Sequence, residues 1–289
     1  MKKTFIALLL AVFVLALYGA AYAAKDNAAV TLRLEKTEGE TVSVSSANGA
    51  DVGILQGMKL YSGHQVTTGM ASYAYLSLDD AKAAKLDANS KAEVRQSGKK
   101  LELNLAAGEI FFNVTAPLKH DETLNIRTST MVTGVRGTSG VVSVIDETTA
   151  EIYLLTGSVT VNYTDRSGTQ RTVTITAGQK ATVNVTKNED GTESTEVTVT
   201  DLTEHEVAGF AAVEVAKDEA LQQQITEQTE LSVPVIIGEA EARLAADQQA
   251  DTERQEQIEQ DIIAATEEEE TDPLFTEEPA TGGGGGSSG

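Results

Sequence analysis

The residue with the clearest chemical potential is Arg136, which lies among small and apolar residues in TSTMVTGVRGTSGVVSV (Thr128–Val144). A guanidinium group presents a planar fork of N–H donors, so Arg136 could bind a carboxylate or a sulfate of a ligand. Gly134 and Gly137 permit backbone angles that other residues avoid, and Thr138 can hydrogen-bond within its own turn. The pattern favours a bend of a β-fold in which Arg136 anchors backbone carbonyls or a carboxylate, with ligand recognition as the alternative.

Two tyrosines form a second candidate site. In SYAYL, Tyr73 and Tyr75 alternate with other residues, which places both rings on one face of a strand. Such a pair could stack against a sugar ring, although packing within a sheet is the more ordinary role. Tyr73, Tyr75 and Arg136 are therefore the speculative ligand contacts of this sequence.

The sequence contains none of the motifs that we associate with catalysis. Cysteine is absent, so there is no thiolate nucleophile and no disulfide. No GxSxG elbow occurs, and TGVRGTSG lacks the lysine-hydroxyl ending of a phosphate loop. No metal-ligand spacing links the three histidines His64, His120 and His205, or matches a calcium loop in Asp79, Asp80, Asp87 and Asn89. We expect no enzyme activity, no catalytic residue, no cofactor and no metal.

Charge divides the chain in two. Residues 24–188 carry 17 acidic and 17 basic side chains, whereas residues 189–289 carry 27 acidic side chains against three basic ones. Nucleic-acid binding is disfavoured because no basic stripe exists to displace counterions from phosphates. One balanced domain is expected to precede an acidic extension.

The N-terminus has the anatomy of a secretory signal. Two lysines precede an apolar run from Phe5 to Leu17, and Ala21-Tyr22-Ala23 supplies small residues for cleavage. Residues 1–23 are therefore interpreted as a signal peptide that is cleaved after Ala23, which places the protein outside the cytoplasm, secreted or at the cell surface or periplasm. Membrane association is expected only if this apolar segment is retained as an anchor.

Residues 30–200 read as an all-β domain. Short runs such as TVSVSS, SVTVNYT and RTVTIT alternate apolar and polar residues, and glycines separate them. No helical stripe of three turns interrupts these runs, so a parallel βαβ architecture is disfavoured. KLELNLAAGEIFFNV is interpreted as a strand, a glycine turn and a second strand.

Residues 201–270 read as an acidic, partly helical extension. Thr203 with Glu206 resembles a capping box at the start of a helix that we expect to dock weakly on the β-domain. The apolar residues near helical spacing are Val207, Phe210, Ala211, Val215 and Leu221. LSVPVIIG is expected to be extended around Pro234, and a long helix with little apolar surface follows it. Residues 271–289 form a flexible Gly/Ser-rich tail.

Three patterns in a fixed order carry a family resemblance. They are LQGMKLYSGHQVTTGMASYAYLSLDD, KLELNLAAGEIFFNV, and VRGT followed by EIYLLTGSVTV and TITAGQKATV. Together they resemble the FecR domain, the extracytoplasmic sensor module of iron-responsive sigma-factor regulators, over roughly residues 52–186. The family-motif positions are Val135, Arg136, Gly137, Thr138, Gly157, Gly178 and Gln179.

The resemblance implies an all-β fold of stacked, solenoid-like strands in one domain, without enzyme activity, that contacts another protein. Only four residues precede the apolar run, so we expect no cytoplasmic anti-sigma segment. The sequence thus predicts an exported bacterial protein that acts as an interaction or sensing module at the cell envelope. Its partner would be an envelope or surface protein, or a cell-wall polymer. A carbohydrate- or peptidoglycan-binding module and a structural subunit that assembles through strand edges are the alternatives.

Overall fold

The fold is a stack of strands in two layers, which we call sheet A and sheet B. The computed structural model describes residues 32–79, 81–116, 118, 121–165, 167–187 and 193–270. All pairings between the described strands are antiparallel except that of β9 with β10. In spatial order, sheet A contains β4 (Met58–Lys59), β1 (Arg33–Glu38), β6 (Tyr73–Asp79), β7 (Lys82–Leu86), β9 (Lys100–Val114), β12 (Ser139–Val144), β13 (Thr149–Thr156), β16 (Gln179–Lys187) and β17 (Glu193–Asp201). Sheet B contains β3 (Asp51–Val52), β2 (Val42–Ser45), β5 (Gln65–Thr68), β8 (Lys91–Ser97), β9 again, β10 (Thr123–Arg127), β11 (Val132–Val135), β14 (Ser158–Thr164) and β15 (Gln170–Thr176).

Strand β9 belongs to both sheets. Its first half pairs with β8 and β10 in sheet B, and its second half pairs with β7 and β12 in sheet A. The change of sheet occurs near Gly108, whose φ of 75° is open to glycine but strained for other residues. A Cβ there would lie 2.2 Å from Ser90 Oγ. The predicted break into two strands is therefore wrong: the glycine bends one continuous strand.

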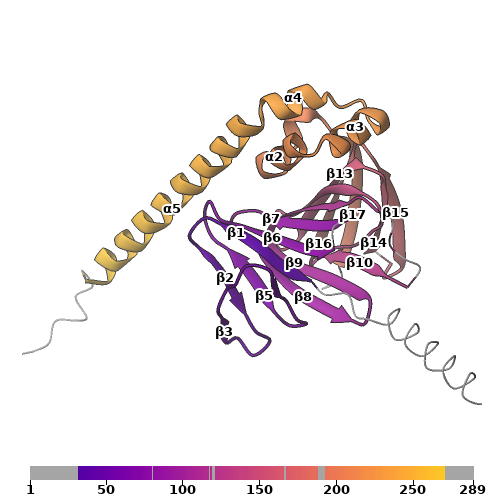
Figure 1. The fold of residues 1–289 in the computed structure, drawn as a ribbon. Coiled ribbons are helices and arrows are strands. Elements are labelled where there is room, and N and C mark those ends of the chain that lie inside the picture. Colours follow the sequence, from indigo (N-terminus) through magenta and orange to yellow (C-terminus); the bar gives the residue numbers. More distant parts are fainter. Residues whose placement is uncertain are drawn as a thin grey trace, which may run out of the picture. The chain divides into compact units, whose positions relative to one another are not determined.

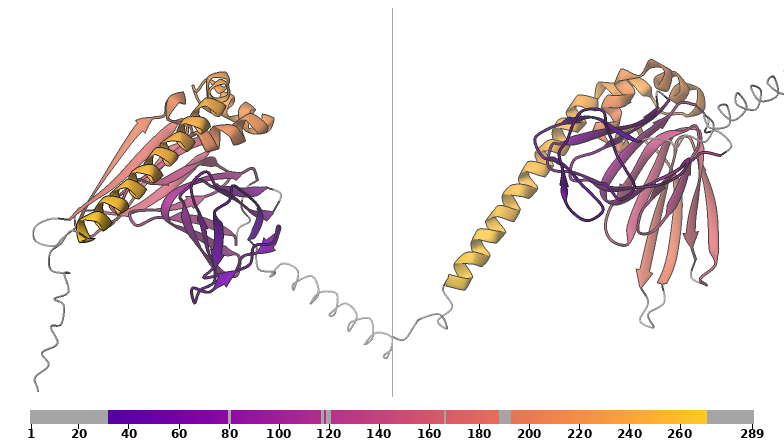
Figure 2. Two further views of the ribbon diagram at one scale, coloured as in Figure 1. Left: turned by 90° about the vertical axis from the view of Figure 1, so that its left-hand side faces the viewer. Right: turned by 60° about the horizontal axis from the view of Figure 1, so that its bottom comes forward.

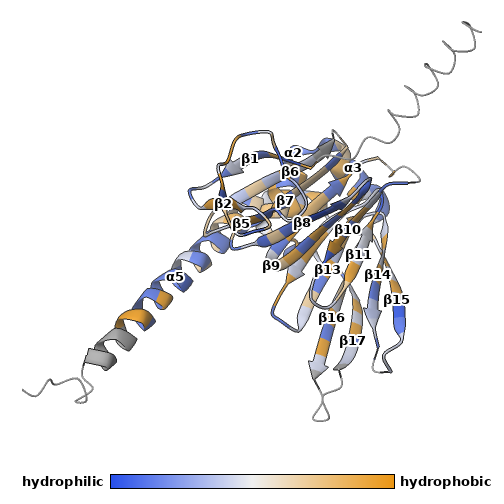
Figure 3. Ribbon diagram, turned by 90° about the horizontal axis from the view of Figure 1, so that it is seen from below, coloured by the Kyte–Doolittle hydropathy of each residue, from blue (hydrophilic) through white to orange (hydrophobic). Residues whose placement is uncertain are grey.

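The chain alternates between the two sheets two strands at a time in its second half. Strands β12 and β13 lie in sheet A, β14 and β15 in sheet B, and β16 and β17 again in sheet A. Inward side chains of both sheets form one apolar core, which includes Val66, Leu103, Phe112, Ile126 and Val161. Figure 3 shows blue, white and orange succeeding one another along these strands, as alternation between core and solvent requires. The predicted all-β fold of stacked strands is confirmed.

A helical segment follows the last strand. It consists of the 3₁₀ turn η1 (Glu204–Glu206) and the helices α2 (Gly209–Lys217), α3 (Glu219–Gln228), α4 (Val233–Gly238) and α5 (Ala240–Glu270). The capping box is present, since Glu206 Oε2 accepts hydrogen bonds from the Thr203 N–H at 2.9 Å and from its hydroxyl at 2.8 Å. The predicted single helix from Val207 to Leu221 is wrong, because Val207 is the C-cap of η1 and Asp218 separates α2 from α3. The Asp218 side chain caps α3 by accepting from the Leu221 N–H at 3.0 Å.

The prediction of an extended LSVPVIIG is wrong, because Val233–Gly238 forms α4. Pro234 occupies the first turn, where a missing N–H costs no intrahelical hydrogen bond and the fixed φ suits a helix. Val233 and Ile236 are buried, so tertiary packing supports this short helix.

The helices α2 to α4 pack on the outer face of sheet A through a second apolar core (Figures 1 and 2). Phe111, Val141 and Leu155 contribute to this core from the sheet. The helices contribute Phe210 and Ile236, both fully buried, among others. The expectation of weak docking is wrong, because the outer face of sheet A is itself apolar and the helices bury it.

One compact unit ends at Asp247, within the first turns of α5. The remainder of α5, taken by itself, is a polar helix on which Ile258, Ile262 and Ile263 are exposed. Across the described residues, no helix is both long enough and apolar enough to cross a membrane.

Candidate functional site

The family-motif residues meet at corners where the chain passes from one sheet to the other. Val135 ends β11, residues 136–138 connect β11 to β12, Gly157 lies between β13 and β14, and Gly178 lies between β15 and β16. Gly137, Gly157 and Gly178 have φ values of 66°, 75° and 77°, which explains why glycine stands there.

These corners contact one another. A Cβ on Gly157 would lie 2.5 Å from Thr138 Cγ2 and 2.8 Å from the Gly137 carbonyl oxygen. The Gly157 N–H donates to Gln228 Oε1 of α3 at 2.6 Å, and Ala177 N–H donates to the Gly157 carbonyl at 2.8 Å. Positions that are separated in sequence thus build one packed corner, which is a structural role.

Gln179, the first residue of β16, stabilises the neighbouring corner at Gly178. Its side-chain oxygen accepts hydrogen bonds from the Thr176 N–H and hydroxyl, both at 3.0 Å. Val135 and Thr138 are buried. The predicted hydrogen bond of Thr138 within its own turn is wrong, because its buried hydroxyl has no partner among the described residues.

Arg136 does not have the anchoring role that its sequence context favours. Its side chain is exposed, and no described residue forms a hydrogen bond or an ion pair with it. The corner is instead held by backbone bonds and by the Thr156 hydroxyl, which accepts from the Ser139 N–H at 3.0 Å. The ligand-contact prediction for Arg136 stays a prediction.

Tyr73 and Tyr75 lie on the same face of β6, as predicted, and this face points toward α2. Tyr73 is buried, and the half-buried Tyr75 donates from its hydroxyl to Glu38 Oε2 at 3.0 Å and to Glu214 Oε1 at 3.3 Å. Burial, followed by the negative charges of Glu214 and Glu38, raises the pKa of Tyr75. The rings therefore pack the sheet–helix interface, and none of the described contacts connects them with Arg136.

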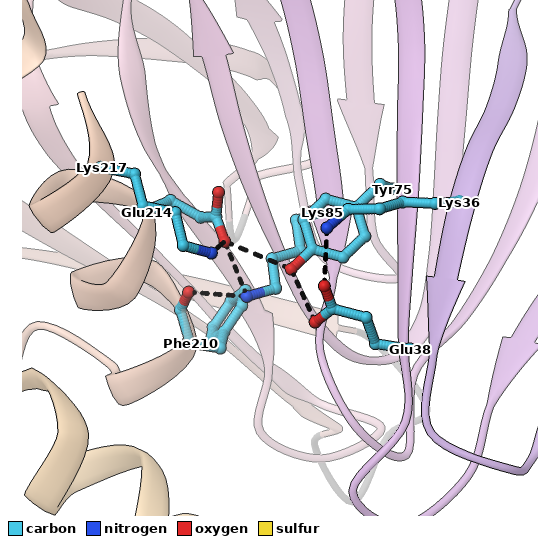
Figure 4. A network of polar contacts seen from close by, with 7 residues as sticks. All are labelled: Lys36, Glu38, Tyr75, Lys85, Phe210, Glu214 and Lys217. Atoms are coloured by element: carbon cyan, nitrogen blue, oxygen red, sulfur yellow. Dashed lines mark hydrogen bonds and ion pairs between the residues drawn. The ribbon is translucent and has the colours of Figure 1, made fainter.

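A buried lysine is the centre of this interface, and the sequence analysis did not anticipate it (Figure 4). Lys85 of β7 donates to Glu214 Oε1 at 3.0 Å and to the Phe210 carbonyl at 3.1 Å. Its ammonium also lies 4.8 Å from the ring centroid of Tyr73 and 5.2 Å from that of Tyr75, within the range of cation–π attraction. The side chain of Lys85 is only 4% exposed.

The ion pair of Lys85 and Glu214 links the sheet to α2. Burial lowers the pKa of Lys85. Burial by itself would raise the pKa of Glu214, but the ammonium groups of Lys85 and Lys217 together outweigh it and the pKa of Glu214 is lowered. The carboxylate is thus held ionised, and Lys217 supports it from the next turn of the helix at 3.1 Å.

Two carboxylates beside this network, those of Asp87 and Glu109, have raised pKa values. Burial raises the pKa of Asp87 to about 7 and the pKa of Glu109 also to about 7, and the negative charge of Asp247 adds to the effect on both. The Asp87 N–H donates to the Glu109 carbonyl at 3.0 Å, so the two groups lie on adjacent backbone. Tyr153 is buried nearby, and its hydroxyl accepts from the Ala208 N–H at 3.0 Å.

The histidines serve separate local contacts. His64 packs edge-on against Tyr61 with ring centroids 5.4 Å apart, and His205 Nδ1 lies 3.2 Å from Glu239 Oε2. His120 and Asp80 lie outside the described residues. Among those that are described, no group of histidine and acidic side chains is arranged to hold a metal ion.

The fold is thus a β-domain of two stacked sheets, and glycine residues occupy the turns at which the chain passes from one sheet to the other. The model of the family described as "FecR protein" matches residues 64–160, inside the segment 52–186 that carries the sequence resemblance. This chain contains a FecR domain, and the resemblance is confirmed.

Solved structures give a weaker likeness. Two crystal structures of a candidate anti-sigma factor from Parabacteroides distasonis ATCC 8503, at 1.65 and 2.50 Å resolution, are each 18% identical in sequence with a TM-score of 0.38. Each alignment covers 48% of this chain and 59% of that protein, so this chain spans less than two thirds of its length. No curated protein matches the chain.

Proposed function

We propose that this chain is an exported, non-enzymatic protein that acts as an interaction or sensing module at the bacterial cell envelope. The observation that carries the proposal is the FecR domain at residues 64–160. Resemblance to this family implies an extracytoplasmic sensor module. The signal-like N-terminus with its Ala21-Tyr22-Ala23 cleavage pattern supports the same location.

The arrangement of polar groups also supports a binding role. The buried polar network around Lys85 is satisfied by protein groups and is covered by α2, so it supports packing more than it supports chemistry. Four hollows on the described surface, of about 330 to 610 Å³, are open to solvent and none of the four is enclosed. Open hollows remain accessible to a large partner, whereas small ligands are usually buried in clefts.

Cell fractionation tests the location. The complete chain with a C-terminal tag is expressed in a bacterium and compared with a Leu9→Arg variant, which interrupts the apolar run of the signal. We expect the unaltered chain outside the cytoplasm and shortened by the signal, and the Leu9→Arg chain retained inside at full length. Retention of the unaltered chain in the cytoplasm would overturn the proposal.

Photo-crosslinking tests the binding role. A photoreactive residue is placed at the exposed position Arg136 and, as a matched control, at the exposed Arg254 of α5. We expect envelope proteins or wall material to be captured from Arg136. If the exported chain with the photoreactive residue at Arg136 captured no more material than the chain with it at Arg254, the result would contradict the interaction role.

A further inference from the structure

The outer face of sheet B carries polar side chains in two rows that cross the strands. Strand register places directly paired, outward residues side by side from β5 to β15. The first row contains Gln65, Glu93, Asn104, Arg127, Asn162 and Thr172, with Val132 of β11 between Arg127 and Asn162. The second row begins at β8 and contains Arg95, Glu102, Asn125, Thr160 and Thr174, with Gly134 of β11 between Asn125 and Thr160.

Along each strand, the residues next to a row residue point the opposite way, into the core. Val94, Leu103 and Ile126 are buried, whereas their neighbours in the rows are exposed or half-exposed. Neighbouring strands lie about 4.8 Å apart, so a row that crosses the seven strands from β5 to β15 is about 29 Å long. The face is therefore long enough for an extended polymer.

Adjoining hollows follow the rows. One of about 590 Å³ is lined by Glu93, Arg95 and Asn125, among others, and a second of about 330 Å³ shares Glu93 with it. A third, of about 390 Å³, is lined by Arg127 and Asn162. Asn125 and Arg127 lie on the same side of β10, so the hollows succeed one another across the sheet.

The two arginines differ in the donors that they keep for a ligand. Arg95 binds Glu93 through Nε and one terminal nitrogen at 3.1 and 3.0 Å, and its other terminal nitrogen lies 3.6 Å from Glu102 Oε1. Arg127 binds the same Glu102 through Nε at 2.9 Å. The side chains of Arg95 and Arg127 are 48% and 42% exposed. Since a guanidinium has five N–H donors, the terminal nitrogens of Arg127 can donate to a ligand carboxylate, and Arg95 can donate through the N–H groups that Glu93 and Glu102 do not occupy.

The composition of the face favours a glycan over a protein. Amides and hydroxyls supply both donors and acceptors along the rows, and Val132 is the one large apolar residue on the paired positions between them. The centres of protein interfaces rely on aromatic and aliphatic anchors, which these rows lack. Along the hollows, Arg95, Lys100 and Arg127 outnumber Glu93 and Glu102, in a chain whose net charge is −22.

We propose that the outer face of sheet B binds an extended, carboxylate-bearing glycan laid across the strands along the two rows. Arg95 and Arg127 bind the carboxylates, while Asn104, Asn125 and Asn162 hydrogen-bond the hydroxyl or amide groups. The site differs from Tyr73 and Tyr75, which α2 covers. This inference rests on the proposed extracytoplasmic function, because such polymers are met outside the cytoplasm.

Sedimentation with insoluble wall and affinity electrophoresis in dissolved polymer test the site. Purified chain is mixed with peptidoglycan sacculi, with polygalacturonate and with neutral dextran. We expect binding to sacculi or to polygalacturonate, and which of the two binds identifies the source of the carboxylates. Equal retention by dextran would overturn the role of the carboxylates, and no binding to either acidic polymer would overturn the proposal.

Paired variants locate the site. We expect the double variant Arg95→Gln/Arg127→Gln to bind at least about tenfold more weakly, as the loss of charge-assisted hydrogen bonds implies. Arg171→Gln is the matched control, because Arg171 is exposed and ion-paired to Asp165 but stands outside the rows. Thermal melting of each variant reports whether it is folded.

The outcomes distinguish this inference from the proposed function. Unchanged binding in the folded double variant would place any glycan site elsewhere. Crosslinking of Asn125 to a protein in place of glycan would overturn the inference and leave the envelope interaction role intact. Retention of the chain in the cytoplasm, by contrast, would remove the basis of both.

Discussion

The outer faces of the two sheets differ in kind, although successive side chains point to opposite faces in both sheets. On sheet A, Phe111, Val141 and Leu155 point outward and lie under the helices. On sheet B, the equivalent positions carry Asn104, Asn125 and other polar residues that remain open to solvent. The side chains on the second face of a sheet therefore decide whether the protein covers that face itself or leaves it for a partner.

The largest effect is expected where the cover meets sheet A. Phe210→Ala removes a fully buried ring of α2, and we expect a loss of about 3–5 kcal/mol in the free energy of unfolding. Urea unfolding followed by circular dichroism measures it. Leu55→Ala is the control, because Leu55 is 73% exposed and should change stability by less than about 0.5 kcal/mol. Similar small losses from both variants would show that the helices do not stabilise the domain.

The second expected effect concerns the polar centre of the same interface. Lys85→Met leaves the Glu214 carboxylate without its main partner in a mostly dry site, at a cost of about 3 kcal/mol. Adding Glu214→Leu should restore most of this stability, since the uncompensated charge is then gone. A double variant no more stable than Lys85→Met would contradict an ion pair between sheet and helix.

A smaller effect should depend on pH. The pKa values of Asp87 and Glu109 are raised to about 7 in the folded state, above ordinary values of 3.8 and 4.5. Their contribution to stability is therefore complete below pH about 4 and is lost as pH rises through about 7. Between pH 6 and pH 8 we expect each group to weaken folding by about 1 kcal/mol.

The groups that face these two carboxylates include Lys85, Ser143, Glu151 and Tyr153 of sheet A and Asp247 of α5. Urea unfolding at pH 6 and pH 8 measures the effect, with Asp87→Asn/Glu109→Gln as the variant in which it should disappear. A dependence that persists in this variant would assign it to other groups.

The smallest effect is expected at the corner that joins the two sheets. Arg136→Ala should change the free energy of unfolding by less than about 0.5 kcal/mol, because the side chain is exposed and without a described partner. Val135→Ala, one position away and buried, should cost more than about 1 kcal/mol. A loss for Arg136→Ala as large as that for Val135→Ala would restore the anchoring role.

Much of the fold could be predicted from local patterns. The alternation in SVTVNYT and RTVTIT indicates strands with one buried face, and Thr203 with Glu206 marks the start of the helical segment. The unbroken apolar residues of EIFFNV and EIYLLTG also differ visibly from these alternating strands. Such runs are typical of strands buried on both faces, and they could have predicted the helical cover of sheet A.

The remaining features depend on contacts that no local pattern encodes. Lys85 and Glu214 are 129 residues apart, so the sequence offers no sign that they pair. Val233–Gly238 is helical because Val233 and Ile236 are buried, which overrides its weak propensity. Gly137 is correctly interpreted as part of a corner, but Gly134 lies within β11 and has no positive φ. The anchoring prediction for Arg136 is wrong because the anchors of that corner are backbone groups and Thr156.

Hydrogen exchange of the complete chain tests most directly the claim that the helices are an integral cover of sheet A. Amides of α2 and α3 should be protected nearly as strongly as those of β9 and β12, and Phe210→Ala should lower both together. Fast exchange throughout α2 and α3, while β9 and β12 stay protected, would contradict the account.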